Sequence, residues 1–329
     1  MKRNIIKVIF GMGLVCGLWS CESGDQSFPD YEGGTTVYFP YQYPVRTIVL
    51  GDDEYDTTLD KAHKCQIKAT FGGSYNGSNG SVTVAVDESL CNNLFFEDGV
   101  TPVQAMPSRF YQLSTNTLNF NGTMNGTVEV QLTDDFFDDR DAVKEIYVIP
   151  LKIVDQSGFT KVLTGQLLEG QSGSRTDASV WDIQPKDFVL YCVKFQNKYS
   201  GFWRTHGTTS TADIESAPEV EIRSLSLNKC AYTVSYQEGD QIYSADMLLT
   251  FDGSNNCTIT SLTDGVSVSG NGSWGDNTEI KAWGNKDRDG MELNYTVDFG
   301  NNHKWSTHEK MVWERSGVKI TEFAPVYVK

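Results

Sequence analysis

A period-two alternation of apolar and polar residues is the feature that most constrains this chain. In the run Met291–Phe299 every odd position is apolar and every even position is polar, as a half-buried antiparallel strand requires. No long stretch shows helical periodicity. No period of roughly 20 to 50 residues repeats, which excludes solenoids and propellers. We therefore expect an all-β protein.

The start of the chain indicates export. Three basic residues in the first seven positions precede an apolar stretch, Val8–Trp19, that is too short to span a bilayer. We interpret residues 1–20 as a lipoprotein signal peptide, because Leu18–Cys21 resembles the lipobox of bacterial lipoproteins. Cys21 is the predicted lipidation site, and two or more acyl chains there would anchor the mature chain. An ordinary secretory signal with an incidental cysteine is the alternative.

Short strands separated by turn residues predict two β domains. About seven strands between 35 and 165 indicate an Ig-like β-sandwich, preceded by a Gly-, Ser- and acid-rich tether at 21–34. An aperiodic Gly- and Ser-rich segment predicts a linker at 166–184. A second series of strands, beginning with Phe188–Phe195, predicts a closed antiparallel barrel over 185–329, since closure removes exposed sheet edges.

Composition and spacing exclude several kinds of partner and site. The formal net charge of −16 repels phosphate backbones, so no nucleic-acid partner is expected. No C-x-x-C or H-E-x-x-H spacing occurs, so we predict no metal site, and no cofactor motif stands out. The cysteines that remain after the signal and the lipidated residue are interpreted as small buried apolar side chains rather than a disulfide framework: Cys65, Cys91, Cys192, Cys230 and Cys257.

An ordered set of short motifs covers nearly the whole mature chain. Four of them resemble the N-terminal β-sandwich called domain of unknown function 1735, which is characteristic of Bacteroidetes surface lipoproteins: Thr36–Pro40, Val82–Leu90, Phe110–Leu113 and Tyr147–Leu151. Val193–Gly201, followed by Trp203 and Gly207, resembles the opening of the lipocalin-like domain often paired with it. Glu22–Asp25 resembles the acidic tag that directs such lipoproteins to the outer face of the outer membrane.

The resemblance implies a place and a role for the protein. Its relatives are surface proteins of polysaccharide-utilisation loci that bind glycans and accompany an outer-membrane import porin. We therefore expect a lipid-anchored outer-membrane protein that faces the cell exterior. Its expected partner is an oligosaccharide or polysaccharide, with an import porin as a second partner.

Glycan binding needs an aromatic face for the apolar side of a sugar and amides or carboxylates for its hydroxyls. Five of the six tryptophans outside the signal lie in the second domain. Polar loops on one rim of the barrel are expected to gather the glycan-binding residues, namely Trp203, Trp274, Trp283, Asp276, Asn277 and Asn285.

Two alternatives stay open. The first is a structural or adhesion protein whose tryptophans all fill the core. The second is a glycoside hydrolase, which needs two carboxylates across a cleft. We predict no catalytic residue, because nucleophile motifs are absent and about 145 residues after the linker are too few for a TIM barrel. The acidic run Asp134–Asp141 is interpreted as a solvated turn, with a surface calcium site as its alternative.

Overall fold

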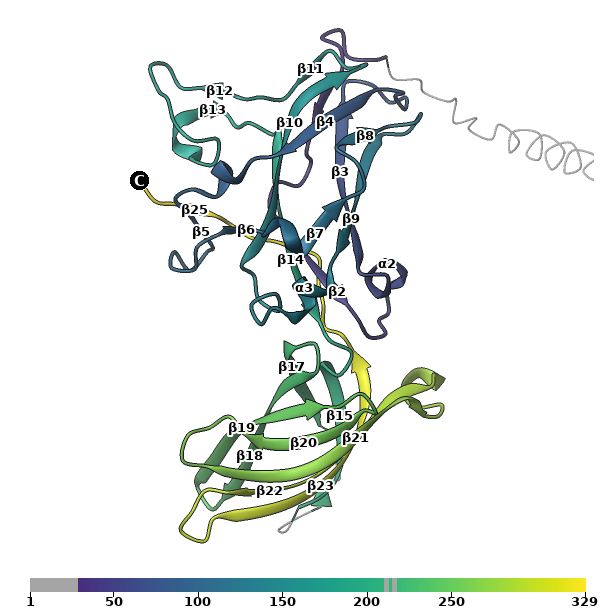
Figure 1. Ribbon diagram of the computed structural model, residues 1–329, viewed down its shortest axis with the longest axis vertical. Helices are drawn as coiled ribbons and strands as arrows, with labels where there is room; N and C mark the ends of the chain where they lie inside the picture. The colour runs from purple at the N-terminus through teal and green to yellow at the C-terminus, as the bar shows by residue number, and fades with distance from the viewer. Residues whose placement is uncertain (1–28, 210–212, 215–217) are drawn as a thin grey trace, which may run out of the picture.

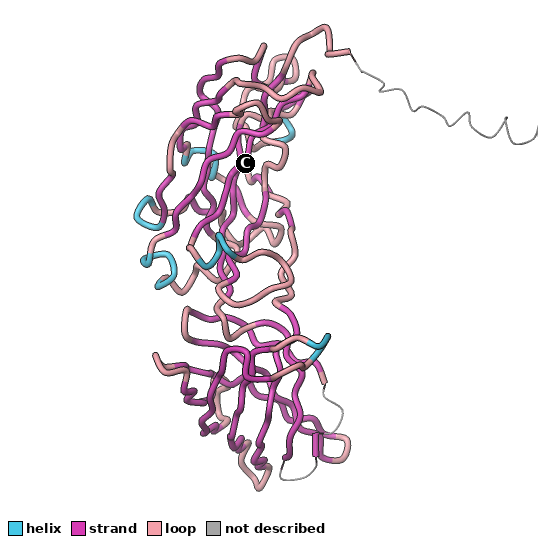
Figure 2. Tube along the Cα trace, turned by 90° about the vertical axis from the view of Figure 1, so that its right-hand side faces the viewer, coloured by secondary structure: helices cyan, strands magenta, loops and turns pink. Residues whose placement is uncertain are grey.

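Two β units stacked along the long axis make up the structure, a computed structural model that describes residues 29–209, 213–214 and 218–329 (Figures 1 and 2). The side chains of residues 213, 214 and 283 are also left undescribed. The predicted signal peptide and the lipidation site Cys21 lie outside the described residues. Among the described helices, none has the length and apolar character needed to cross a bilayer. The all-β prediction is confirmed.

The upper unit is a β-sandwich of two sheets that face each other across one large apolar core. The first sheet has the order β11 (Lys161–Val162), β1 (Thr36–Tyr38), β3 (Lys64–Gly72), β9 (Asn125–Leu132) and β7 (Tyr111–Leu113). The second has the order β24 (Thr321–Glu322), β2 (Pro44–Val49), β14 (Phe188–Gln196), β10 (Tyr147–Ser157), β4 (Ser81–Val86) and β8 (Thr117–Asn119), with β6 (Gln104–Ala105) also paired to β10.

Short elements connect and cover these sheets. Two α-helical turns and three 3-10 turns occur in the sandwich: α2 (Thr58–Lys61), α3 (Asp134–Asp138), η2 (Glu88–Cys91), η3 (Ser108–Phe110) and η4 (Ala178–Val180). Two further strand pairs are β12 (Gln166–Leu167) with β13 (Trp181–Ile183), and β5 (Leu94–Phe95) with β25 (Val326–Tyr327). The acidic run that was interpreted as a solvated turn is partly helical, and α3 buries Phe136 and Phe137 in the core.

The predicted boundary between the domains is wrong. Strand β14, expected to open the barrel, instead lies in the second sheet of the sandwich, antiparallel to β10 and parallel to β2. Its first six residues are all buried, because its two faces pack into two different apolar clusters. An unbroken apolar run is typical of a strand covered on both faces rather than of a half-exposed barrel strand. The barrel therefore begins after residue 196, not at 185.

The C-terminal segment also belongs to the sandwich. After leaving the barrel the chain returns to pair β24 with β2 and β25 with β5. Phe323, between these strands, is buried against Tyr43 and Phe96, with ring centroids 5.4 and 4.8 Å away. The barrel is thus inserted between two segments of the sandwich, and the chain crosses the junction twice.

The lower unit is a closed antiparallel barrel. Its strands follow in chain order as β15 (Gly201–Thr209), β17 (Glu219–Ser226), β18 (Lys229–Glu238), β19 (Gln241–Phe251), β20 (Asn256–Ser261), β21 (Ser267–Glu279), β22 (Arg288–Asp298) and β23 (Lys304–Arg315). Pairing of β15 with β23 closes the ring, β16 (Asp213–Ile214) pairs with β15, and η5 (Trp283–Asn285) lies between β21 and β22. The alternation predicted for 291–299 is present, since Met291, Leu293, Tyr295 and Val297 are buried.

Large side chains fill the barrel. Trp203, Trp305 and Trp313 are all buried in its core, and Trp305 stacks on Tyr236 with ring centroids 4.9 Å apart. An eight-stranded barrel is just wide enough to be filled in this way. Four of the five described cysteines are buried, as expected, and the fifth, Cys91, is half-buried; all five are free.

One carboxyl group lies within this core. Glu309 on β23 is 4% exposed, and the Tyr232 hydroxyl donates to its Oε1 at 3.2 Å, whereas its Oε2 has no well-aligned donor. Burial raises the pKa of Glu309, and the hydroxyls of Tyr295, Tyr232 and Thr205 oppose this rise only in part. The folded barrel therefore favours the protonated acid.

Replacement of Glu309 tests this burial. Because its folded pKa is raised, the group's contribution to stability is present below the ordinary pKa of 4.5 and is lost as the pH rises through the folded value. Glu309→Gln removes the charge, so we expect a higher Tm than wild type at pH 7, by roughly 2–4 °C per kcal/mol, and little difference near pH 4. Glu221→Gln on exposed β17 is the control. A Tm difference independent of pH would contradict the assignment.

The C-terminal return is tested at Phe323. Phe323→Ala is expected to destabilise the sandwich by about 3–5 kcal/mol, as removal of a buried phenyl ring does, measured by urea unfolding. Ile320→Ala, three residues earlier and 99% exposed, should change stability by no more than about 0.5 kcal/mol. Equal effects of the two substitutions would show that the C-terminal segment does not hold the sandwich.

Candidate functional site

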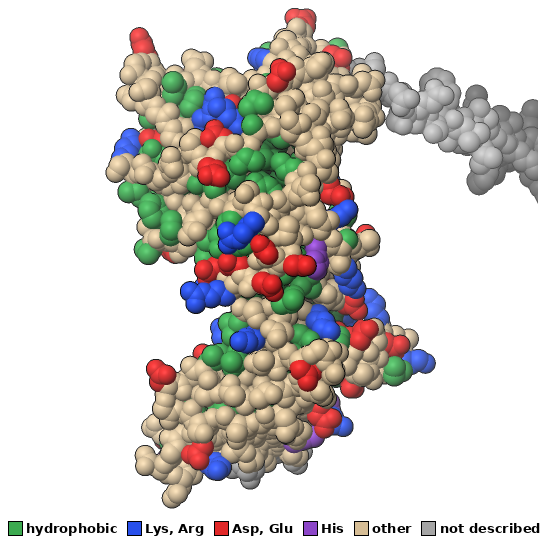
Figure 3. All heavy atoms as spheres, in the orientation of Figure 1, with side chains coloured by type: hydrophobic (Ala, Val, Ile, Leu, Met, Phe, Trp, Pro, Cys, Tyr) green, Lys and Arg blue, Asp and Glu red, His purple; other side chains and the backbone are tan. Residues whose placement is uncertain are grey.

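Two adjoining hollows form a groove where the sandwich meets the barrel, and charged side chains gather at this waist (Figure 3). One hollow, of about 370 Å³, is lined by Trp274, Lys198 and Asn255; we call it the tryptophan lobe. The other, of about 400 Å³, is lined by Arg288 and Arg315; we call it the arginine lobe. Asp52 and Asp289 line both lobes, so the two form one junction groove.

The sandwich wall of the groove is the loop 50–57 between β2 and α2. Asp60 of α2 is buried and fixes the loop, because it accepts a hydrogen bond from the Val49 amide at 2.9 Å and pairs with Arg46. The Lys61 ammonium lies 2.6 Å from the Asp52 carboxylate. The last anchor is the hydrogen bond that Ser316 donates to Asp53 across the junction. Asp52 is therefore held facing the barrel.

The barrel wall of the groove is a large irregular β-bulge in the β21–β22 pair. Gly275 pairs with Gly290, and Glu279 with Arg288, so residues 276–278 stand opposite the single residue Asp289. Extra residues in one strand bend it away from its partner. Asn277 has a φ of 51°, and its amide donates to Asp289 Oδ1 at 3.0 Å. The bulge thus directs Asp276 outward and holds the carboxyl group of Asp289 in the groove.

Three carboxylates meet at the centre of the groove. Oxygens of Asp52, Asp276 and Asp289 all lie within 4.8 Å of one another. Asp289 is 6% exposed. Its burial is the main reason that its pKa is raised to about 6, and the negative charges of Asp276 and Asp52 add to the rise. Carboxylate oxygens are ligands that hard cations such as Ca²⁺ prefer. Within the described residues, Asp52, Asp276 and Asp289 together could therefore hold such a cation.

The tryptophan lobe places an indole ring beside polar groups. The Trp274 ring is partly exposed, with the Lys198 ammonium 4.2 Å from its centroid and Tyr199 edge-on at 5.5 Å. Asn255 Oδ1 accepts hydrogen bonds from Lys198 and from the Tyr199 hydroxyl, both at 3.0 Å. The indole Nε1 has no hydrogen-bond partner. An aromatic surface, an ammonium and an amide therefore converge in one hollow.

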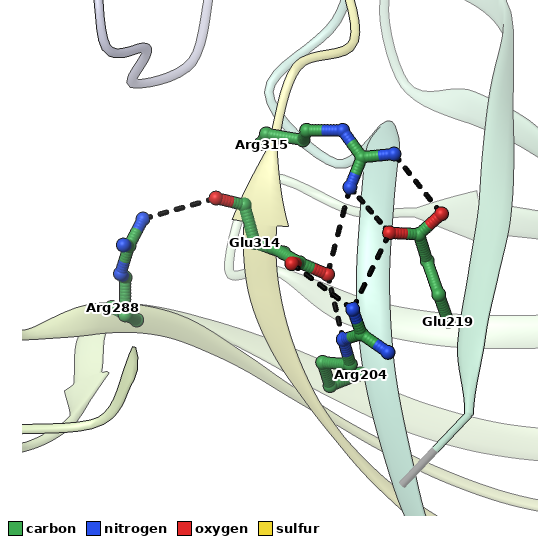
Figure 4. Close-up of polar contacts among 5 residues, drawn as sticks. All are labelled: Arg204, Glu219, Arg288, Glu314 and Arg315. Carbon is green, nitrogen blue, oxygen red and sulfur yellow. Dashed lines mark hydrogen bonds and ion pairs between the residues drawn. The ribbon is translucent and has the colours of Figure 1, made fainter. Parts of the chain in front are cut away.

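Ion pairs fix the rim of the arginine lobe (Figure 4). Arg315 pairs with Glu219, and Arg204 Nε lies 2.7 Å from Glu314 Oε2, so the network joins strands β15, β17 and β23. Hydrogen bonds from Arg315 keep the pKa of Glu219 below its ordinary value. Arg288 Nη1 donates to the Glu314 carbonyl at 3.1 Å. Both lobe-lining arginines are thus held by named contacts.

A larger hollow of about 600 Å³ lies between β14 of the sandwich and strands β15 and β17 of the barrel. The two aromatic residues that line it are Phe195, which is buried, and Phe202, whose ring is covered by the Arg315 guanidinium at 4.2 Å. Lys198 lies over Trp274 at the same distance, so the junction groove is preferred because three carboxyl groups converge next to its indole ring.

The structure separates the predicted glycan-binding residues. Trp274 and Asp276 line the tryptophan lobe, and Asn277 lies beside them through its bond to Asp289. The prediction for Trp203 is wrong, because its ring is fully buried (0% exposed) in the barrel core. The side chain of Trp283 lies outside the described part of the chain. Asn285 is exposed on η5 and lines neither lobe.

Sequence reasoning missed most of the groove. Asp289 and Asp52 belong to no motif that was singled out, and Lys198 lies in the motif Val193–Gly201 without having been assigned a role in binding. Tyr55, in the loop next to the groove-lining Glu54, is 70% exposed. An unusually acidic stretch, Asp52-Asp53-Glu54, was the one local signal available. Its position against the barrel follows from the way the two units dock.

Comparison with known proteins places the chain among proteins of unknown function. Residues 194–317 match the model for a domain of unknown function, DUF5627, and residues 31–160 match a model described as an N-terminal domain. A crystal structure of a protein of unknown function from Bacteroides ovatus is 34% identical, with a TM-score of 0.82, and the match covers 91% of this chain and 100% of that chain. No curated protein matches.

Two other Bacteroides ovatus structures overlap less well. A multidomain protein including DUF1735 is 12% identical, with a TM-score of 0.41, over 84% of this chain and 93% of that one. A putative carbohydrate binding protein from strain ATCC 8483 is 13% identical, with a TM-score of 0.27, over 88% and 99%. Such low scores carry no argument about this chain, and the predicted resemblance of the sandwich to domain 1735 stays a prediction.

The coupling of the three carboxyl groups is testable by titration. NMR of the labelled Asp289 carboxyl carbon should show a midpoint at about pH 6. Asp276 raises the pKa of Asp289, so Asp276→Asn should move this midpoint downward, because a like charge next to the carboxylate is removed. Asp264→Asn, at an exposed position outside both lobes, is the control. An unchanged midpoint in Asp276→Asn would show that the two groups are not coupled.

Proposed function

This chain belongs to the same family as the 34%-identical Bacteroides ovatus protein of unknown function, and we propose that it is a noncatalytic glycan-binding protein of the cell surface. It captures an oligosaccharide in the junction groove. Its role is to retain the sugar near an import porin as part of a polysaccharide uptake system. The fold supports this proposal only by providing the groove; the side chains in the groove supply the chemical argument.

The observation that carries the proposal is the arrangement around Trp274. A partly exposed indole lies in one hollow with Lys198, Asn255 and Asp276. Sugars bind through contact of their C–H faces with aromatic rings and through hydrogen bonds from hydroxyls to amides, carboxylates and ammonium groups. The tryptophan lobe offers each of these within a volume suited to a small ligand, roughly 300–1,000 Å³.

The proposed location rests on the start of the sequence. A basic, apolar leader followed by Cys21 supports lipid anchoring, and the acidic residues after it support display on the outer face of the outer membrane. A tether at 21–34 would then hold the sandwich and barrel away from the membrane. Mass spectrometry of the natural product tests this part, because it should find a diacylglyceryl group at Cys21 and no residues 1–20.

Glycoside hydrolysis is the second candidate, favoured by the carboxyl groups of the groove. A hydrolase needs one protonated and one ionised carboxyl group. Asp289, with its pKa raised to about 6, and its neighbour Asp52 offer such a pair. Release of soluble products from a polysaccharide panel, abolished in Asp289→Asn, would establish hydrolysis in place of binding alone.

The binding proposal is tested by affinity gel electrophoresis against a panel of plant, fungal and host polysaccharides. We expect wild-type protein to be retarded by at least one of them. Trp274→Ala should weaken that retention by on the order of threefold to tenfold, since an aromatic contact contributes about 0.5–1.5 kcal/mol.

Two further variants separate binding from folding. Asp276→Ala changes an exposed side chain of the same lobe and should also weaken retention, without a fall in Tm. Trp181→Ala removes a partly exposed tryptophan from β13 of the sandwich and should leave retention unchanged. Retention by no polysaccharide, or equal retention of wild type and both lobe variants, would contradict the proposed function.

A further inference from the structure

Carboxyl groups outnumber basic groups in both lobes of the groove. The tryptophan lobe is lined by three carboxyl groups and two ammonium groups, and the arginine lobe by six carboxyl groups and three basic side chains. The chain as a whole carries a formal net charge of −16. A ligand that enters the groove therefore meets an excess of negative charge at close range and a negative field further out.

The charges at the centre of the groove are only partly neutralised by the protein. The Asp52 carboxylate is paired with the Lys61 ammonium at 2.6 Å. Among the residues that the structure describes, Asp276 and Asp289 form no ion pair, and their Oδ1 atoms accept hydrogen bonds at 2.8 and 3.0 Å from the side-chain and backbone amides of Asn277. Oxygens of the three carboxyl groups lie within 4.8 Å of one another. An incoming anion would add a further like charge to this cluster.

The second ammonium group of the tryptophan lobe is already held by neutral partners. Lys198 donates to Asn255 Oδ1 at 3.0 Å, and its ammonium lies 4.2 Å from the centroid of the Trp274 ring. A cation over an aromatic face is attracted to it electrostatically. An anion that paired with Lys198 would draw it away from these contacts and would still lie in the same hollow as Asp276 and Asp289.

Hydrogen-bonding capacity favours the same class of ligand. An ionised carboxylate accepts hydrogen bonds and donates none, whereas a hydroxyl group both donates and accepts. Above about pH 6, where Asp289 is ionised, the carboxylates of the lobe are acceptors alone. Hydroxyl groups of an uncharged sugar supply donors to them. A sugar carboxylate would place one acceptor against another.

We infer that the tryptophan lobe selects uncharged glycans and rejects anionic ones, such as polysaccharides rich in uronate or sulfate groups. This inference rests on the proposed function and narrows it to a substrate class. Asp276 and Asp289 set the selection, because theirs are the lobe carboxylates that no basic group of the described chain neutralises by an ion pair. Selection of this kind comes from a repulsive element in the site as well as from its attractive contacts.

Charged and uncharged forms of one polysaccharide test this inference. Each neutral polysaccharide that retains wild-type protein is prepared as a carboxymethyl ether and as a hydroxyethyl ether of the same degree of substitution, so that the two differ in charge but little in size. Isothermal titration calorimetry on the full mature chain at pH 8, with EDTA present, measures the affinity for each. We expect the carboxymethyl form to bind about tenfold more weakly, or worse, because like charges are brought together.

The ratio of the two affinities should depend on the named charges and on salt. Asp276→Asn and Asp289→Asn each keep an oxygen acceptor and remove a charge, so each should shrink the ratio by roughly twofold to fivefold. Raising NaCl from about 0.1 M to about 1 M should also shrink it, because the Debye length falls from about 10 Å to about 3 Å. Asp264→Asn removes a charge at an exposed position outside both lobes and should leave the ratio as in wild type.

The outcomes distinguish this inference from the proposed function. If a neutral polysaccharide binds but its carboxymethyl form binds as tightly as its hydroxyethyl form, or if Asp276→Asn and Asp289→Asn give the same ratio as Asp264→Asn, selection by charge is overturned and the proposed function stands. Binding of acidic polysaccharides alone, or tight binding of the carboxymethyl form once Ca²⁺ replaces EDTA, would overturn it in the same way. If no polysaccharide binds wild-type protein, both are rejected.

Discussion

The double passage of the chain between sandwich and barrel is the constraint on which the rest of the structure depends. The chain leaves the sandwich at the end of β14 and re-enters it at β24, and these two crossings touch where Gln196 donates to the Ser316 carbonyl at 3.1 Å. Gly201, just inside the barrel, has a φ of 120°, and a β-carbon there would lie 2.7 Å from the Arg315 carbonyl oxygen. Close backbone contact at both crossings sets the barrel against loop 50–57.

The chemistry of the groove follows from this docking. Asp52 comes from the sandwich, whereas Asp276 and Asp289 come from the barrel, so their carboxylates converge only because the units meet. Burial of Asp289, and after it the negative charges of Asp276 and Asp52, raise the pKa of Asp289 to about 6. A protonated carboxyl group donates a hydrogen bond while its neighbours accept, and a sugar hydroxyl can do both. Below about pH 6 the groove therefore offers a hydroxyl both a donor and acceptors, and above that pH its carboxylates are acceptors alone.

The barrel and the sandwich differ in how they use aromatic residues. Trp203, Trp305 and Trp313 fill the barrel core, which rules out the rim cluster expected around Trp203. Trp274 packs against this core but stays partly exposed, because it precedes the bulge at 276–278, where β21 separates from β22. Tyr55, in the sandwich loop next to Glu54, is exposed but lines neither lobe. The aromatic surface of the tryptophan lobe thus comes from Trp274, next to the bulge in β21.

Local patterns in the sequence predict the class of fold well. Alternation in 291–299 fixes the buried face of β22, and turn residues mark the limits of most barrel strands. The same patterns do not predict how the sandwich and the barrel pack against each other. The largely apolar run 188–195 is compatible with the first strand of a new domain or with the centre of an existing sheet, and only its pairing with β10 and β2 decides between them.

Within the groove, Trp274 and Asp276 could be predicted because polar residues surround them in the sequence, although they lie on strand β21 and not in a loop. Asp52 and Asp289 could not be, since their roles depend on contact between segments more than 200 residues apart.

Hydrogen–deuterium exchange on the full mature chain, with and without a retained polysaccharide, tests the central claim most directly. It locates a bound glycan without any substitution. If the junction groove is the glycan site, amides of loop 50–57 and of residues 274–289 exchange more slowly together when the polysaccharide is present. Protection confined to any other surface, with both of these segments unchanged, would contradict the assignment.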